Sequence, residues 1–264
     1  MNGTIIARLM TFLSESHLFP SYSARKRLAF RYLHGTGLEI GALQHPLEVP
    51  MGVTVRYVDY VTREENIRRY PHLDESRIVV TDQIDDGFEL TTIPDDSQDF
   101  VIANHLLEHA PNPLHTLLNW NRVLKKRGIL FMTLPDGTRN LDQGRGITPL
   151  EHIVEDYELV KTDELEQFAR RNREHYREFV DISIPNLNRM RQRRPMTEER
   201  KQEYLEKLVE EQSTDPHFHV FTRESMIQLC NHLIAVHAPD LSLQETVRSR
   251  FGQEYVLILK KQGS

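Results

Sequence analysis

The chain has very little cysteine, because Cys230 is the only one among 264 residues. A single thiol excludes an intramolecular disulfide and a zinc site built from several thiolates. The surrounding run 226–234 has apolar residues at helical spacing, which predicts a buried thiol. The lack of disulfide chemistry fits a reducing compartment, so we expect a cytoplasmic protein.

Long apolar runs are also lacking. No stretch of about 18 apolar residues occurs, so no membrane span is expected. Residues 4–13 are fairly apolar, but Arg8 interrupts them and no small-residue cleavage site follows. We therefore expect an amphipathic helix there rather than a signal peptide.

The chain has no excess of positive charge, since its formal net charge is −6 at pH 7. This balance disfavours a broad electrostatic surface for DNA or RNA, and we expect no nucleic-acid partner. The basic run 189–194 is short and ends at Pro195, which is typical of a solvated helix end. A hydrophobic content of 39% indicates a globular protein, with one large domain and insertions or one domain and a small appendage.

Short apolar segments alternate with amphipathic ones from residue 37 onwards. The apolar segments predict strands at 38–41, 53–59, 77–81, 100–104 and 128–134. Helical spacing predicts helices at 63–70 and 113–126, between these strands. Strands that alternate with helices form a parallel sheet with right-handed crossovers, so we expect an α/β fold.

This alternation stops after Pro135. A charge-dense region follows, with helical stretches at 163–179 and 197–211 and no convincing strand. Near the end, a predicted helix at 222–236 precedes two strands, 241–247 and 254–260, joined by a turn at 249–253. We therefore expect a helical lead-in (1–34), an α/β domain (35–157 and 217–264) and a helical insertion or cap (158–216).

Polar side chains and a glycine follow the predicted strands. They are Glu39 and Gly41, Asp59, Asp82, Asn104 and His105, and Asp136. In open α/β sheets, ligands bind outside the carboxyl ends of the strands. A glycine lets the backbone approach a ligand, and a carboxylate about twenty residues later can accept hydrogen bonds from a ribose. The set predicts a site for a nucleotide-type cofactor.

Three stretches carry a family resemblance: 38–41 (LEIG), 58–59 (VD) and 99–109 (DFVIANHLLEH). Together with 122–131 and Pro135-Asp136, they resemble class I S-adenosylmethionine-dependent methyltransferases over residues 35–137. The resemblance implies a Rossmann-like sheet of seven mostly parallel strands with a late antiparallel hairpin, and S-adenosylmethionine as cofactor. The implied cofactor-binding residues are Glu39, Gly41 and Ala42 for the methionine moiety; Asp59 and Tyr60 for the ribose; Asp82, Gln83 and Ile84 for the adenine; and Asn104 and His105 near the sulfonium. His109 is a further implied cofactor-binding residue.

The first loop departs from this family pattern, which usually has two or three glycines. In the run 41–46 only Gly41 matches, and the glycines at 35 and 37 precede the predicted strand. Asp59 and the stretch 99–109 favour a retained site. A non-catalytic domain that binds a cofactor or a partner remains an alternative because the loop has lost glycines.

The run His105-Leu-Leu-Glu-His109 also fits the H-x-x-E-H signature of zinc peptidases. Two histidines four residues apart share a helix face and could bind zinc, with Glu108 as the base. However, the run directly follows a predicted buried strand, and Pro111 and Pro113 break any helix at once. A zinc hydrolase is therefore the least favoured interpretation.

Candidate bases for the acceptor lie further along the chain. Methyl transfer to a hydroxyl needs a group that removes its proton, and the histidine pKa suits this role. The candidates are His152, His217 and His219. The last two could instead bind a divalent ion with Glu151 or Asp156, but we assign no metal ligand from the sequence.

Two fragments, 148–152 and 217–222, are similar to methyltransferases of bacterial surface-glycan gene clusters. This resemblance implies O-methylation of a sugar, a glycan or another small-molecule hydroxyl. Transfer to a nitrogen of a small metabolite remains the alternative reaction. The sequence leaves the acceptor and the oligomeric state open.

Overall fold

The computed structural model describes residues 20–249 and 254–263, so the helix expected at 4–13 and most of the turn expected at 249–253 lie outside the described residues. Seven strands form one sheet in the order β3-β2-β1-β4-β5-β7-β6. Neighbouring strands run parallel except for β7, which is antiparallel to both β5 and β6. The strands are β1 (Thr36–Ile40), β2 (Thr54–Asp59), β3 (Gln83–Ile84), β4 (Gln98–Asn104), β5 (Leu124–Pro135), β6 (Leu241–Arg248) and β7 (Glu254–Lys261). This order and the late hairpin confirm the predicted α/β, Rossmann-like fold.

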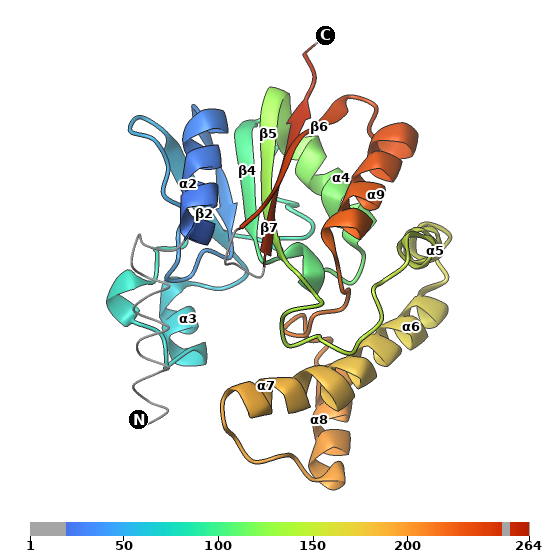
Figure 1. Cartoon of the computed structure of the whole chain (residues 1–264). Coiled ribbons are helices and arrows are strands. Elements are labelled where there is room, and N and C mark those ends of the chain that lie inside the picture. The colour runs from blue at the N-terminus through green and yellow to red at the C-terminus, as the bar shows by residue number, and fades with distance from the viewer. Residues whose placement is uncertain (1–19, 250–253, 264) are drawn as a thin grey trace.

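Helices cover both faces of this sheet and one of its ends (Figure 1). They are α2 (Pro20–Tyr32), α3 (Arg63–Arg69), α4 (Pro113–Val123), α5 (Leu150–Lys161), α6 (Leu165–Glu178), α7 (Ile184–Met190), α8 (Glu198–Glu210) and α9 (Arg223–His232). Two short 3₁₀ turns, η1 (Glu75–Arg77) and η2 (Leu107–His109), and two π turns, η3 (Phe179–Ser183) and η4 (Leu233–His237), complete the described elements. None of the helices within residues 20–249 and 254–263 has the length and apolar character of a membrane span.

The core has two layers because successive strand residues point to opposite faces of the sheet. On β4, Phe100 and Ile102 pack with Leu28 of α2 on one face. Val101 and Ala103 face the other way, where α4 and α9 cover them. The central strands are therefore apolar on both faces, as expected for parallel strands with helices on each side.

The third strand is shorter and lies later than the predicted 77–81. Residues 75–77 form η1 instead, which Asp74 caps by accepting a hydrogen bond from the Ser76 backbone. In the apolar run that suggested a strand, Ile78 is buried but Val80 is 65% exposed. Pairing with the end of β2 occurs only at Gln83–Ile84. The apolar run misled the prediction because it lies at the open edge of the sheet.

The helix expected at 113–126 ends at Val123, because Leu124 already pairs with Gln98 as the first residue of β5. The predicted strand 128–134 is the central part of β5. Near the end of the chain, η4 replaces the last turn of the helix expected at 222–236.

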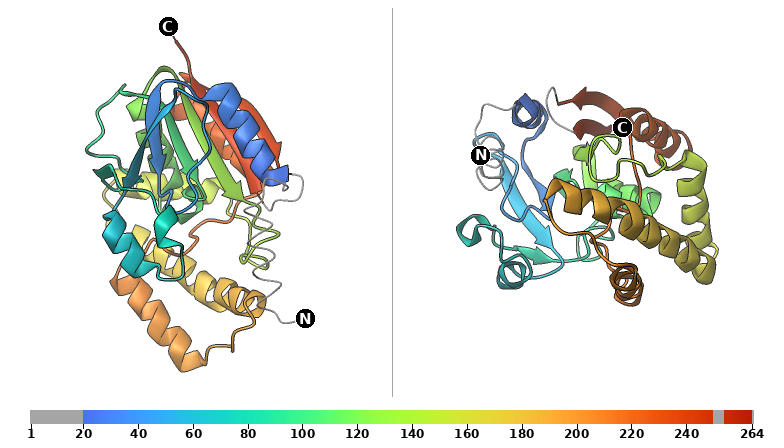
Figure 2. Two further views of the ribbon diagram at one scale, coloured as in Figure 1. Left: turned by 90° about the vertical axis from the view of Figure 1, so that its left-hand side faces the viewer. Right: turned by 60° about the horizontal axis from the view of Figure 1, so that its bottom comes forward.

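Helices α6, α7 and α8 gather at one end of the sheet, as Figures 1 and 2 show. They have a small apolar core of their own, which includes Tyr176, Phe179 and Leu205 together with Phe218. The end they cover is the carboxyl end of the parallel strands, because the backbone N–H groups of Phe218 and His219 both donate to the carbonyl of Glu108, just after β4. The helical region therefore lies against the edge where ligands bind in this class of fold.

Gly37 lies inside β1, rather than before it, and allows close packing against β4. A Cβ atom at this position would lie 2.2 Å from the carbonyl oxygen of Phe100. We expect Gly37→Ala to lower the free energy of unfolding by about 3 kcal/mol, because the added methyl group must displace a buried strand. Denaturant unfolding followed by Trp120 fluorescence measures this change. Gly146→Ala, at an open site, is the matched control, and an equal effect of both substitutions would contradict the close packing.

Candidate functional site

Two adjoining cavities open at the carboxyl ends of the central strands. The first, which we term the Asp59 cavity, has a volume of about 460 Å³ and lies between the ends of β1 and β2 and the loop 86–88. The second, the Glu39 cavity, has a volume of about 740 Å³ and lies over the loop 41–47. Gly41, Leu43 and His105 line both cavities. The two spaces therefore meet at the end of β1, at the strand-end edge where ligands bind in open α/β sheets.

Asp59 supplies a carboxylate to the first cavity at the end of β2. It is 9% exposed and accepts a hydrogen bond of 3.0 Å from the side chain of Asn66 on α3. Burial raises the pKa of Asp59, although the hydrogen bonds from Asn66 and Val61 oppose this shift. Tyr60 and Phe88 also line the cavity. A carboxylate can accept hydrogen bonds from ring hydroxyl groups, and aromatic or apolar walls can pack against a flat base. The Asp59 cavity therefore suits a ligand that has both.

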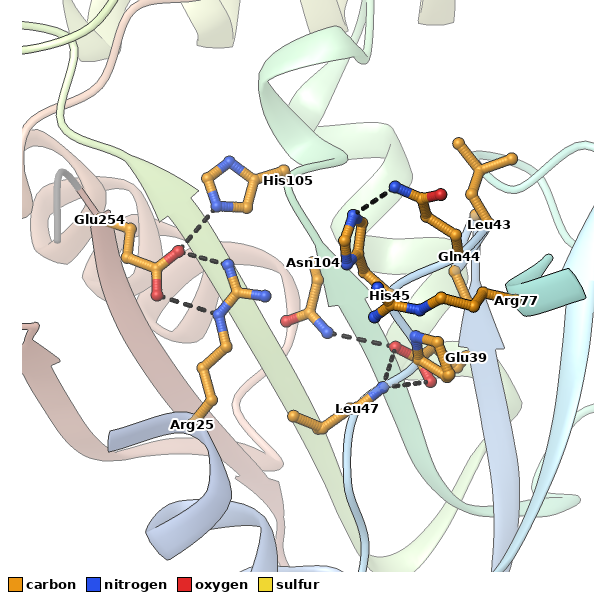
Figure 3. A pocket seen from close by; sticks show the side chains of 13 residues that line it. Arg25, Glu39, Leu43, Gln44, His45, Leu47, Arg77, Asn104, His105 and Glu254 are labelled. Carbon is orange, nitrogen blue, oxygen red and sulfur yellow. Dashed lines mark hydrogen bonds and ion pairs between the residues drawn. The ribbon is translucent and has the colours of Figure 1, made fainter. Parts of the chain in front are cut away.

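The loop after β1 turns with a single glycine. Gly41 has φ +64°, and Leu43 also adopts a left-handed conformation, with φ +47°. The Glu39 carboxylate accepts hydrogen bonds from the Leu47 backbone, with both oxygens at 3.0 Å. The side chain of Asn104 donates to the same carboxylate at 3.3 Å (Figure 3). Glu39 therefore holds the far end of a glycine-poor loop against β1 and β4.

Glu39 is 1% exposed and carries its carboxyl group at the floor of the second cavity. Burial raises its pKa to about 7, despite the hydrogen bonds from Leu47 and Asn104. Near neutral pH this carboxyl group is therefore divided between the acid and the carboxylate form. Its structural role as an acceptor for the Leu47 backbone needs only one lone pair and survives protonation.

An ion-paired cluster of Arg25, His105 and Glu254 forms another wall of the Glu39 cavity (Figure 3). Arg25 on α2 donates two hydrogen bonds to Glu254, one of them of 2.9 Å from Nε to Oε1. His105 Nε2 lies 2.8 Å from Glu254 Oε2. The cluster joins the first described helix, the end of β4 and the start of β7. Sequence reasoning missed Arg25 and Glu254, because no local pattern marks residues that meet from distant parts of the chain.

Charge within this cluster shifts two pKa values in opposite directions. Burial lowers the pKa of His105, but its interactions with Glu108 and Glu254 outweigh this effect and raise the value to about 9. Burial raises the pKa of Glu254, but the bonds from His105 and Arg25 lower the value to about 2. The pair is therefore ionised at neutral pH, with a positive imidazolium facing both cavities.

The residues expected near the adenine lie outside both cavities. The side chain of Asp82 accepts a hydrogen bond from the Tyr57 backbone, Gln83 bonds to Arg56 and Thr92, and Ile84 is 52% exposed. Asp86, Gly87 and Phe88, a few residues further along the chain, line the Asp59 cavity.

Two buried side chains, Trp120 and Asp85, fix the position of the loop 86–88 by hydrogen bonds. Trp120 of α4 donates a hydrogen bond of 2.8 Å from Nε1 to the carbonyl of Gly87. Asp85 accepts hydrogen bonds from the backbone and hydroxyl groups of Thr91 and Thr92. A Cβ atom at Gly87 would lie 2.4 Å from the side chain of Ile40, so this glycine brings the loop close to β1.

None of the three candidate bases is among the residues that line the two cavities. His217 lies edge-on to His109, with 4.6 Å between ring centroids, and its Nδ1 is 2.5 Å from Asp142 Oδ2. His219 is 1% exposed and lies beside His152 in a different group of side chains. The structure thus places His217 and His219 in two different groups of side chains.

The H-x-x-E-H run does not form the helix that a zinc peptidase requires. Leu107–His109 is a single 3₁₀ turn, and His105 before it has φ +52°. His105 turns to Glu254, whereas His109 Nδ1 lies 3.0 Å from the Thr214 carbonyl and lines the Asp59 cavity. The two histidines are therefore directed to different partners and do not share a helix face.

Comparison with known proteins agrees with this architecture. Residues 35–132 match the family described as "Methyltransferase domain", whereas no curated protein matches the chain significantly. A structure from Rhodobacter sphaeroides, described among "Zn-dependent Alcohol Dehydrogenases", has 15% identity and a TM-score of 0.51 over 92% of this chain and 90% of that chain. A SAM-dependent methyltransferase from Thermotoga maritima has 15% identity and a TM-score of 0.48, with coverage of 98% and 97%. One from Aquifex aeolicus has 12% identity and a TM-score of 0.45, with coverage of 99% of each chain.

Residues 35–132 match the methyltransferase-domain family, and the sheet has the strand order of the Rossmann-like methyltransferase fold, so this part of the chain is a class I S-adenosylmethionine-dependent methyltransferase domain. It is a methyltransferase, and its cofactor is S-adenosylmethionine. The structural likenesses at these identities concern the fold alone.

Asp59 offers a direct test of the cofactor site. We expect Asp59→Ala to weaken binding of S-adenosylhomocysteine by about 10- to 100-fold, because a hydrogen bond to a charged group contributes about 1.5–3 kcal/mol. Isothermal titration calorimetry measures the change. Asp82→Ala is the matched control and should alter affinity by less than about threefold, because Asp82 lies outside the cavity. The reverse order of effects would place the ribose at β3 instead of β2.

Proposed function

We propose that this methyltransferase transfers the methyl group to an oxygen of a sugar or of another small, hydroxyl-rich molecule. The observation that supports this proposal is the number of hydrogen-bonding side chains around the Glu39 cavity, which adjoins the Asp59 cavity. Eight of its lining residues have hydrogen-bonding side chains: Arg25, Glu39, Gln44, His45, Arg77, Asn104, His105 and Glu254. Arginine, histidine and amide side chains that can donate and carboxylates that can accept thus line one cavity, and recognition of several hydroxyl groups needs both kinds of group.

We assign the cofactor to the Asp59 cavity and the adjoining loop. The Asp59 carboxylate would accept hydrogen bonds from the ribose, with Tyr60 beside it, and Gly87 and Phe88 would pack against the adenine. The methionine end would lie towards the first loop and the end of β4, near Gly41, Ala42, Asn104, His105 and His109. S-adenosylmethionine supplies an electrophilic methyl group on sulfur, so the protein must orient the acceptor and take up its proton.

His105 is the proposed base, in place of His152, His217 and His219. It lines both cavities, so its imidazole lies where the cofactor and the acceptor would meet. In its neutral form it can accept the hydroxyl proton as the oxygen attacks. Glu254, held by Arg25, would then stabilise the imidazolium and fix the ring orientation. These three residues would act together as a proton-accepting unit.

The helical region 158–216 is proposed to act as a cap over the substrate edge of the α/β domain, with 1–34 as a lead-in. Support for this comes from Thr214 and Asp215, at its end, which line the Asp59 cavity beside His109. Closing this edge would exclude water from the transferred methyl group. A cytoplasmic location is also proposed, since the only thiol, Cys230, is free and buried.

The acceptor class is tested with a matched panel of sugars, sugar nucleotides and amino compounds. With radiolabelled S-adenosylmethionine we expect label on hydroxyl compounds and none on the corresponding amines. Nuclear magnetic resonance of the product then identifies the methylated oxygen. Label on amines alone would contradict the O-methyl assignment while leaving the methyltransferase class intact.

The pH profile tests the assigned base. Because His105 must be neutral to accept a proton and its pKa is about 9, kcat/KM should rise about tenfold per pH unit below pH 9 and then level off. His105→Gln should lower kcat by about 100- to 10,000-fold and abolish this rise. His115→Gln, on the outer side of α4, is the control. An unchanged profile in His105→Gln would exclude His105 as the base.

A further inference from the structure

Four potential metal ligands lie together away from the two cavities. His152 and Asp156 are one turn apart on α5, His175 is on α6, and His219 lies in the segment before α9. One ligand atom from each lies within 4.8 Å of all the others. Asp156, His175 and His219 are 0%, 7% and 1% exposed. Three separate segments therefore bring three imidazoles and one carboxylate to one buried point.

The distances within this group approach those of a tetrahedral metal site. His152 Nε2 is 3.0 Å from His175 Nε2 and 3.1 Å from Asp156 Oδ2. With metal–ligand bonds of about 2.1 Å, the ligand atoms of a tetrahedral zinc site lie about 3.4 Å apart. The ring centroid of His219 lies 4.8 Å from that of His175 and 5.9 Å from that of His152, so its imidazole also borders the centre of the group.

Two polar atoms in the group are buried without a hydrogen-bond partner in the described part of the chain. They are Nδ1 of His219 and Oδ2 of Asp156, which lies 3.1 Å from His152 Nε2 without the geometry of a hydrogen bond. Removing such an atom from water without a partner destabilises the folded protein. Both belong to the four-residue group, and a cation at its centre would satisfy both at once.

Neighbouring groups form hydrogen bonds to His219 and Asp156 that fix the orientation of these side chains, as is typical of metal ligands. His219 Nε2 lies 3.4 Å from the carbonyl oxygen of Pro111. A carbonyl only accepts, so the ring proton is on Nε2 and the lone pair of Nδ1 is available to a metal. Arg171 donates to Asp156 Oδ1 and to the His152 carbonyl. Asp156 Oδ2 is thereby left for the centre of the group.

We propose that these four residues bind one zinc ion through His152 Nε2, Asp156 Oδ2, His175 Nε2 and His219 Nδ1. Imidazole nitrogens favour zinc over magnesium or calcium, which prefer oxygen ligands. Four protein ligands close the coordination shell, so the role of the ion is structural rather than catalytic. Among the described residues, Glu108, His109 and His217 form a second cluster of this kind, which offers three ligand groups instead of four.

The ion would connect the helical region 158–216 to the methyltransferase domain and restrict their relative movement. It would link α5 and α6 to His219, whose backbone N–H donates to the Glu108 carbonyl beside His109. His109 in turn contacts the carbonyls of Thr214 and Pro216. Zinc bound at this point would therefore hold the segment 214–216 over the Asp59 cavity.

Metal analysis of the purified full-length protein tests the proposal. We expect about one zinc per chain in the wild type and in the control His115→Ala, and less than about one tenth of that in His175→Ala and His219→Ala. Wild-type protein that takes up no zinc after dialysis against it would overturn the proposal. Stoichiometric zinc retained in both His175→Ala and His219→Ala would also overturn it.

A second measurement covers the case in which these variants do not fold. Wild-type protein stripped of metal and titrated with Co²⁺ should develop the strong visible absorption of tetrahedral cobalt, which added zinc should remove. The conservative variant Asp156→Asn should bind Co²⁺ at least about tenfold more weakly than the control. A weak, octahedral-type cobalt spectrum in the wild type would contradict the four-ligand assignment. The cobalt titration does not depend on methyl transfer, so it is independent of the proposed acceptor.

Discussion

The site is organised around one buried carboxylate, that of Glu39. It accepts hydrogen bonds from the Leu47 backbone and the Asn104 side chain, and so joins the end of β1 to the far end of its loop and to β4. A buried carboxyl group is stable only with such partners. The loop can then turn with one glycine, because Leu43 is held in a left-handed conformation between the two cavities. The division of the strand-end edge into two adjoining cavities follows from this loop.

The second organising interaction joins distant parts of the chain by charge. Arg25, Glu254 and His105 come from α2, β7 and the turn after β4, and they meet at the wall of the Glu39 cavity. The antiparallel β7 makes this possible, because its first residue lies at the same edge as the carboxyl ends of the parallel strands. The late hairpin therefore completes the sheet and also places the Glu254 carboxylate at the wall of the Glu39 cavity.

Much of the fold could be predicted from local patterns. The apolar cores of β1, β2, β4 and β5 are short runs that only a buried strand accounts for, and the polar residues after them mark the ligand edge. The prediction failed at β3, where an apolar run at the sheet edge resembled a strand although only Gln83–Ile84 pair with β2. The adenine contact that we propose lies at 86–88, whereas the family resemblance implied 82–84. Edge strands are poorly predicted because few neighbours constrain their position.

The sequence by itself determined the class of fold, the strand-end residues Glu39, Asp59, Asn104 and His105, and the family resemblance. The histidines could be recognised as candidate functional residues from the sequence, but only the tertiary structure decided which side chains each of them contacts. His217 and His219 are two residues apart and belong to different groups, whereas His152, His175 and His219 meet from three segments. The physical reason is that periodicity reports which face of an element is buried, while charge pairs and ligand clusters depend on how separate elements pack together.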